Sequence, residues 1–185
     1  MASRARVPSG SRLSVLLASR GVDMEDLFRD ARLARLLEYW RGKRGNRPAP
    51  ARSNIKPMEL GPLVSIIHLI DVHRDPLGFC HRLVGAEIVD RVGRDVTGKW
   101  VDETLYGPAT NEVFDGLAAV AWEVRPYRRL ARLDWHDRPW IAMESLEMPL
   151  LDEDGRVNMI LRGASHFTVG ADWGVARRMS WPIGV

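Results

Sequence analysis

The stretch 79–99 constrains the fold most, because glycines divide it into three short elements. Residues 79–84 are apolar and aromatic, which is typical of a half-buried strand, and Gly85 ends that strand. Residues 86–92 then repeat apolar side chains at helical spacing, and Gly93 marks the end of the helix. A polar turn bounded by glycine closes the stretch. Strands and helices this short favour a mixed fold over a helical bundle.

The same stretch contains part of a phosphate-binding motif. Gly93, Gly98 and Lys99 match the GxxxxGK portion of a P-loop, but Trp100 stands where the Mg²⁺-binding hydroxyl is required. A P-loop also follows a strand and precedes a helix, whereas here a helix precedes it and no helical pattern follows. We interpret this segment as a structural turn.

Composition places the chain among ordinary globular proteins. Its 185 residues are 45% hydrophobic and 28% charged, and no apolar run is long enough to cross a membrane. Cys80 is the single cysteine, so an intrachain disulfide and a cysteine-based metal cage are both excluded. This pattern favours a reducing, cytoplasmic location.

Charge and hydropathy divide the chain into four parts. Residues 1–22 carry arginines and no acid, which predicts a flexible basic arm. Residues 23–47 predict an amphipathic helix and a linker, and residues 48–169 a folded domain. The Gly- and Trp-containing tail, 170–185, is expected to be irregular.

The leading helix is predicted from Met24 to Arg41, with Asp23 as its N-cap. Its apolar face is so broad that it must lie against the domain or against a second copy of the chain. We predict that this face binds a partner copy through four large side chains, Leu33, Leu36, Leu37 and Trp40.

The folded domain alternates hairpin-like strands with a helical middle. A helix is expected at 110–124, and strands are expected at 63–71, 79–84, 127–135, 140–151 and 157–169. This order predicts an α+β fold, with a five-stranded antiparallel sheet and helices on one face.

From about Leu36 to about Gly163, that order and several local motifs resemble a PAS domain, and more narrowly a family of short, mostly single-domain bacterial PAS-like proteins. The motifs are Tyr39-Trp40, Pro50-Ala-Arg52, Ile55-Lys-Pro-Met-Glu-Leu60, Arg82-Leu-Val-Gly85, Gly93-Arg-Asp-Val-Thr-Gly98, Glu144, Met148-Pro-Leu150 and Asp154-Gly155.

The resemblance implies a sheet that cradles a small pocket under the middle helices, and a role in signal sensing or protein interaction without catalysis. It implies a homodimer, often formed through the leading helix, and it names no cofactor. No kinase, cyclase or DNA-binding pattern follows the expected sheet, so we expect either that the output comes from a signalling partner or that the protein is only a receiver.

Polar and aromatic residues on the expected strands and helices are the pocket candidates. Arg82 interrupts an apolar strand. It either binds an acidic ligand, or forms a structural ion pair, for example with Glu144 or Glu147, or lies on an exposed edge. Glu144 also interrupts an apolar strand, and it is either a ligand contact or a structural partner. The other candidates are His68, His81, His166, Trp122 and Trp140, for which ordinary packing is the alternative. The histidines lack metal-binding spacings such as HExxH, and no metal is assigned.

Two other functions remain open. A small α+β enzyme, of cyclase or isomerase type, would need an acid/base pair in the pocket, for which Glu144 with a histidine is the visible candidate. A nucleic-acid binder would use the arginine clusters at 41–52 and 125–132, although nearby acids balance them and the net charge is only +3. We expect a small-molecule ligand or a protein partner, and neither a membrane nor a nucleic acid.

Overall fold

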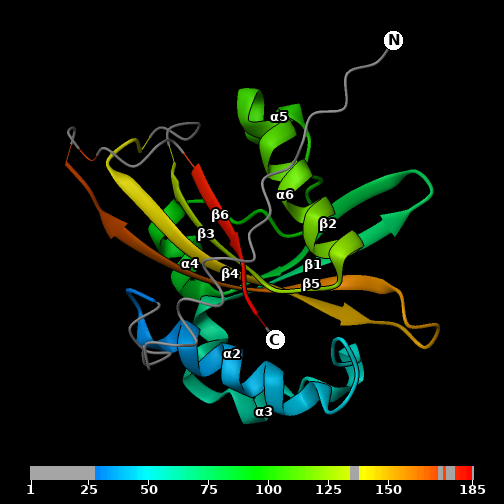
Figure 1. The fold of residues 1–185 in the computed structure, drawn as a ribbon. Helices are drawn as coiled ribbons and strands as arrows, with labels where there is room; N and C mark the ends of the chain where they lie inside the picture. The colour runs from blue at the N-terminus through cyan, green and yellow to red at the C-terminus, as the bar shows by residue number, and fades with distance from the viewer. Residues whose placement is uncertain (1–27, 134–137, 171–172, 174–177, 185) are drawn as a thin grey trace.

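The computed structural model describes residues 28–133, 138–170, 173 and 178–184 (Figure 1). The predicted basic arm and the first residues of the predicted leading helix lie outside this range.

One antiparallel sheet forms the centre of the molecule. Its strands run in the order β2-β1-β5-β4-β3-β6, and every neighbouring pair is antiparallel. The predicted α+β class with an antiparallel sheet is therefore confirmed. The bounds of the strands are β1 Ile67–Arg74, β2 Leu77–Val84, β3 Tyr127–Arg132, β4 Ile141–Leu151, β5 Val157–Thr168 and β6 Arg178–Pro182.

The sheet differs from the prediction in two strands, β6 and β1. It has six strands instead of five, because the tail that was expected to be irregular contributes β6, which pairs along β3. The strand expected from residue 63 begins only at Ile67, because a 3-10 helix occupies Gly61–Ile66. Pro62 at the start of that helix has no N–H to donate to a ladder, and Gly61 has a φ of 51°.

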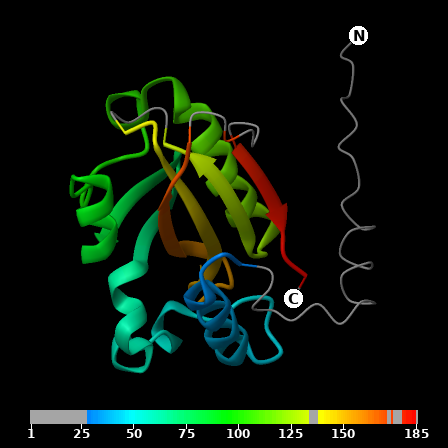
Figure 2. The same cartoon turned by 90° about the vertical axis from the view of Figure 1, so that its left-hand side faces the viewer.

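Helices cover both faces of the sheet (Figures 1 and 2). The middle helices gather on one face, as expected, and the leading helix packs on the opposite face against β4 and β5. The bounds are α2 Ala31–Arg44, α3 Pro57–Leu60, α4 Ala86–Val92, α5 Glu103–Tyr106 and α6 Thr110–Glu123, with further 3-10 turns at Arg52–Asn54 and Gly107–Ala109.

Helix α2 begins later than predicted and uses a different cap. Residues 28–30 are not helical, and the Asp30 side chain, instead of that of Asp23, accepts the hydrogen bond from the N–H of Arg32. The helix ends at Gly45, whose φ is 57°.

The apolar stripe of α2 is buried within its own chain. Leu33, Leu36, Leu37 and Trp40 each have 0% of their surface exposed. Gly163 of β5 allows this close approach, since a Cβ there would lie 2.5 Å from Leu36 Cδ2. Trp40 Nε1 also donates to the Pro149 carbonyl at 2.9 Å. The prediction that these four side chains bind a partner copy is therefore corrected: they complete the core of the domain.

Gly85, between β2 and α4, should tolerate no side chain. A Cβ at this position would lie 2.3 Å from the backbone oxygen of Ser65, and a backbone atom cannot yield as a side chain does. We expect Gly85→Ala to lower the free energy of unfolding by about 1–3 kcal/mol. Gly42→Ala is the control: its Cβ meets nothing within 4 Å, and alanine should stabilise α2 by about 0.5–1 kcal/mol. Urea denaturation measures both, and equal effects would refute the close approach at Gly85.

Candidate functional site

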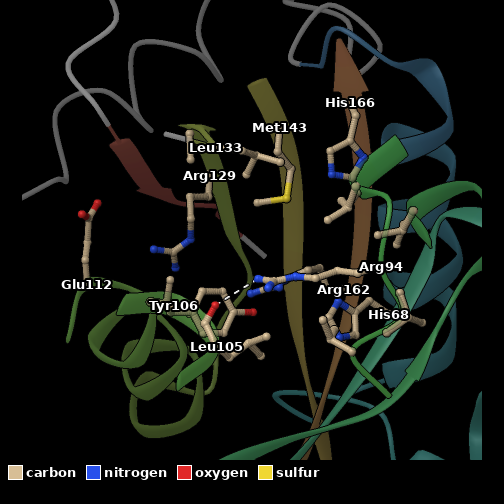
Figure 3. A pocket seen from close by; sticks show the side chains of 17 residues that line it. His68, Arg94, Leu105, Tyr106, Glu112, Arg129, Leu133, Met143, Arg162 and His166 are labelled. Atoms are coloured by element: carbon tan, nitrogen blue, oxygen red, sulfur yellow. Dashed lines mark hydrogen bonds between the residues drawn. The ribbon is translucent and has the colours of Figure 1, made fainter. Parts of the chain in front are cut away.

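A cavity lies between the sheet and helices α4–α6 (Figure 3). Its volume is about 70 Å³. On the same scale a single water occupies roughly 10–15 Å³, so the cavity holds on the order of five waters or a ligand of similar size. It matches the small pocket under the middle helices that the sequence led us to expect.

Most of the cavity wall is apolar. Side chains from the sheet and from the α4–α6 segment enclose it: Val84, Ile88, Val92, Val96, Leu105, Val113, Ala131, Leu133, Met143 and Ala164. Strand alternation selects the members from the sheet, because Arg129 and Ala131 are two residues apart and share one face of β3, and Leu133 lies just beyond the end of that strand. A wall of this kind binds an apolar body and leaves recognition to the few polar groups beside it.

Three neighbouring strands meet at the buried carboxylate of Glu147 on β4. Arg129 of β3 donates to it at 2.7 Å, and Arg162 of β5 donates at 2.8 Å. Glu147 is 0% exposed, and both arginines line the cavity. Burial alone would raise the pKa of this carboxyl, but the two guanidinium groups outweigh burial and lower the pKa to about 2.

Two further charged residues line the cavity from the helical side. Arg94, which follows α4, donates to the backbone oxygen of Leu105 at 3.0 Å. Glu112 lies on α6, near enough for its charge to raise the pKa of Arg129. The polar part of the cavity is therefore built from both the sheet and the helices that cover it.

A chain of hydrogen bonds connects two histidines to Tyr106. His68 Nε2 lies 2.7 Å from His81 Nδ1, and His81 Nε2 lies 2.9 Å from the Tyr106 hydroxyl. Arg162 also hydrogen bonds to Tyr106, and a guanidinium can only donate. We therefore assign the Tyr106 proton to the bond with His81, which in turn makes His81 Nδ1–H the donor to His68.

All three histidines near the cavity favour the neutral form. Burial, reinforced by the charge of Arg162, places the pKa of His68 well below its usual value and lowers that of His81 to about 3. Burial also lowers the pKa of His166 to about 4, although the carboxylate of Glu87 opposes it. At neutral pH these imidazoles act as hydrogen-bonding groups without charge.

The structure brings some of the predicted pocket residues together. His68 and His166 line the cavity, and His81 lies directly behind His68. His166 also lines a second, shallower hollow, where Trp140 is found; this tryptophan is 53% exposed and does not contact the inner cavity.

Glu144 lies on the other face of the sheet from the cavity. Its neighbour Met143 lines the cavity, so strand alternation directs Glu144 towards the side that α2 covers. It is fully buried there, and it accepts from Arg128 Nε and from the backbone N–H of Arg29, each at 2.8 Å. Of the two predicted roles, the structural one is observed: Glu144 attaches the segment before α2 to the sheet.

Arg82 and Trp122 are on the surface. The Arg82 side chain is 58% exposed and forms an ion pair with Asp71 at 2.8 Å, so its partner is neither Glu144 nor Glu147. Trp122 is 60% exposed, with the Arg74 guanidinium 4.5 Å from its ring centre. Neither residue lines the cavity.

Sequence reasoning missed the charged centre of the site. Arg129, Arg162, Glu147, Arg94 and Tyr106 were not among the predicted pocket residues. A signal was present, because Glu147 and Arg162 interrupt long apolar strands, and a mid-strand charge needs a partner. Which charges meet depends on strand order, and β5 pairing beside β4 is a long-range property.

Comparison with known proteins establishes the family. A PAS domain family model matches residues 28–164, and the chain therefore belongs to the PAS domain family. This confirms the resemblance seen in the sequence. No curated protein sequence matches the chain.

Two solved structures are similar to this chain at low sequence identity. A sensory box sensor histidine kinase from Vibrio cholerae is 16% identical, with a TM-score of 0.43 over 61% of this chain and 92% of that one. VqmA bound to DPO is 13% identical, with a TM-score of 0.39 over 59% of this chain and 50% of that one.

Membrane and metal sites were also considered. Among the residues that the structure describes, no helix is both long and apolar enough to span a bilayer. Within the same residues, no group of three or more His, Cys, Asp or Glu side chains is arranged to hold a metal ion.

Acid should destabilise the protein in two stages. His68 and His81 stay neutral when folded but bind protons in the unfolded chain below the ordinary histidine pKa of 6.5, so stability is lost as pH falls through that value. Below the ordinary glutamate pKa of 4.5, Glu147 adds to the loss, because its pKa in the folded protein is only about 2. His166 behaves in the same way as the other two histidines, because its pKa in the folded protein is about 4. Urea denaturation should therefore give an unfolding free energy about 3–4 kcal/mol lower at pH 5.5 than at pH 7.5. His68→Gln should remove roughly a third of that difference; equal stability at the two pH values would contradict the buried neutral histidines.

Substitution of the two buried glutamates should lower the free energy of unfolding by different amounts. Glu147→Gln removes the charge that two buried arginines share, and should lower the free energy of unfolding by about 3–5 kcal/mol. Glu144→Gln should cost less, about 1–2 kcal/mol, because water reaches Arg128 and glutamine still accepts a hydrogen bond. Denaturation of both variants beside the parent tests the order, and the reverse order would show that Glu144 is the more important support.

Proposed function

We propose that this PAS domain is a sensory module whose cavity between the sheet and helices α4–α6 binds a small molecule. The observation that carries the proposal is the combination of an apolar wall with polar groups held in place by Glu147 and the His68–His81–Tyr106 chain. Such a mixture of apolar surface and a few oriented polar groups is the usual composition of a ligand pocket.

The sheet offers a route from the cavity to the leading helix. On β5, Ala164 and His166 face the cavity, whereas the intervening positions face α2. Gly163 receives Leu36 of α2, and Ser165 hydrogen bonds to Asp30, the N-cap of that helix. A ligand that shifts β5 would therefore act on the packing and the cap of α2. We propose that a signalling partner, or a second copy of the chain, senses this change.

The two alternative functions find less support. The enzyme needed Glu144 beside a histidine, but Glu144 lies on the α2 side of the sheet while His68 and His166 line the cavity on the other side. We therefore propose a non-enzymatic role. A cytoplasmic location remains an expectation from the sequence.

The nucleic-acid alternative needed a free arginine surface. In the 41–52 cluster, Arg41 pairs with Glu38, and Lys43 pairs with Glu59. Arg47 donates to Asn54. These contacts within the chain occupy cations that would otherwise bind phosphates.

Native mass spectrometry of the purified chain, beside its denatured mass, tests the proposal. We expect either a retained small molecule or, for a ligand lost in purification, thermal stabilisation by members of a metabolite library of matching size. Val113→Phe should abolish either signal, because Val113 lines the cavity and the added ring fills it. Val89→Phe is the matched control, since Val89 is half-buried on the adjacent helix α4 but does not line the cavity.

The proposal is overturned if the parent protein retains nothing and no library member stabilises it. It is also overturned if Val113→Phe, confirmed as folded by circular dichroism, binds as the parent does.

A further inference from the structure

Among the residues that the structure describes, the arginines around the cavity outnumber the carboxylates. Three arginines line it, Arg94, Arg129 and Arg162, whereas Glu112 in the wall and Glu147 beside it are the described carboxylates. Within this set one positive charge is in excess. The neighbouring histidines cannot reverse this sign, because they are neutral or, if protonated, positive.

The arginines on the sheet are oriented by Glu147 in a way that leaves an edge for a ligand. Arg129 and Arg162 both contact Glu147 through Nε and Nη2. A guanidinium is planar and carries five N–H groups, so Nη1 of each lies on the edge away from Glu147. Figure 3 shows Arg94 and Arg162 both reaching towards Tyr106 within the cavity. A carboxylate placed there meets guanidinium donors from both residues, beside the Tyr106 hydroxyl that accepts from Arg162.

Because the cavity is buried, its excess positive charge should favour an anionic ligand over a neutral one. A charge enclosed in an apolar cavity is costly unless an opposite charge accompanies it, and salt screens such a site poorly. A neutral ligand would displace water from around the arginines without replacing the lost solvation. An anion would restore charge balance and accept hydrogen bonds that were already oriented.

The size of the cavity and its apolar wall narrow the class of ligand further. The cavity of about 70 Å³ corresponds to a ligand of roughly five to eight non-hydrogen atoms. Ten of the residues that line it are aliphatic or methionine side chains. The rest of the ligand must therefore be a short apolar body.

We infer that the ligand is a small organic monoanion, a carboxylate with a short apolar chain, whose carboxylate is bound by Arg94 and the outer edge of Arg162. This inference rests on the proposed function, because it assumes that the cavity is a ligand site. It adds the charge and chemical class of what the site binds.

Isothermal titration calorimetry at pH 7.5, with the dialysed full chain, compares straight-chain carboxylates from acetate to hexanoate with the corresponding primary amides. The amides match the acids in shape but carry no charge. We expect an optimum at intermediate chain length, where the apolar cavity is filled. Each amide should bind at least about tenfold more weakly than its acid, because hydrogen bonds to charged groups are the stronger ones.

Two variants assign the effect to the cavity. Arg94→Gln should weaken carboxylate binding about tenfold to a hundredfold and leave amide binding nearly unchanged. Arg94 is outside the Glu147 ion pairs, so the variant should keep its fold. Arg35→Gln is the matched control: it removes the same charge from an exposed position on α2, and should bind the carboxylates as the parent does.

The outcomes separate the two proposals. If amides bind as well as acids, or Arg94→Gln binds acids as the parent does, the anion inference is wrong while the sensory cavity stands. If Arg35→Gln weakens binding as much as Arg94→Gln, the acids bind by overall charge, and the inference is also wrong. If neither acids nor amides bind and the metabolite library also fails, the proposed function falls with it.

Discussion

The buried carboxylate of Glu147 is the interaction on which the rest of the structure depends. It joins β4 to its two neighbours through Arg129 of β3 and Arg162 of β5. Such a buried ionic cluster gains little stability over an apolar core of the same volume, but removing one member leaves uncompensated charge. Apolar side chains could have joined the three strands equally well. Under the proposed function, the arginines would serve the adjacent cavity as well as the sheet.

The pleat of the sheet explains how one domain combines a cavity with a packed helix. Successive residues of β4 and β5 point to opposite faces, so Met143 and His166 line the cavity while Glu144 and Ser165 hold the segment at the start of α2. No residue needs to span the sheet to connect the two sides. A displacement of either strand by a ligand must move both sets of side chains, because they share one backbone.

The sequence predicted the fold better than the site. Strand and helix periodicity is local, and it correctly indicated β2, α4, α6, β4 and β5 and the antiparallel class of the sheet. It failed where tertiary contacts decide. β6 has no clear alternation and forms along the edge of β3. α2 begins only at Ala31, after its N-cap Asp30, because the preceding Arg29 donates its backbone N–H to Glu144. The same limit applies to the site. Arg82 and Glu144 look alike in the sequence as charges in apolar strands, but strand position exposes the first and buries the second on the α2 side.

The neutral histidines and the charged arginines belong to one electrostatic arrangement. Burial, reinforced by the charge of Arg162, lowers the pKa of His68 and of His81, and the buried Tyr106 connects His81 to Arg162 by hydrogen bonds. An anion bound at Arg162 would reduce the positive field at those imidazoles and so oppose this lowering. Because proton and ligand binding are linked, an anion bound there would raise the pKa of those imidazoles for as long as the ligand itself stays ionised. Under the proposed function, the same burial that makes the domain sensitive to acid would couple the protonation of the histidines to the charge of the ligand.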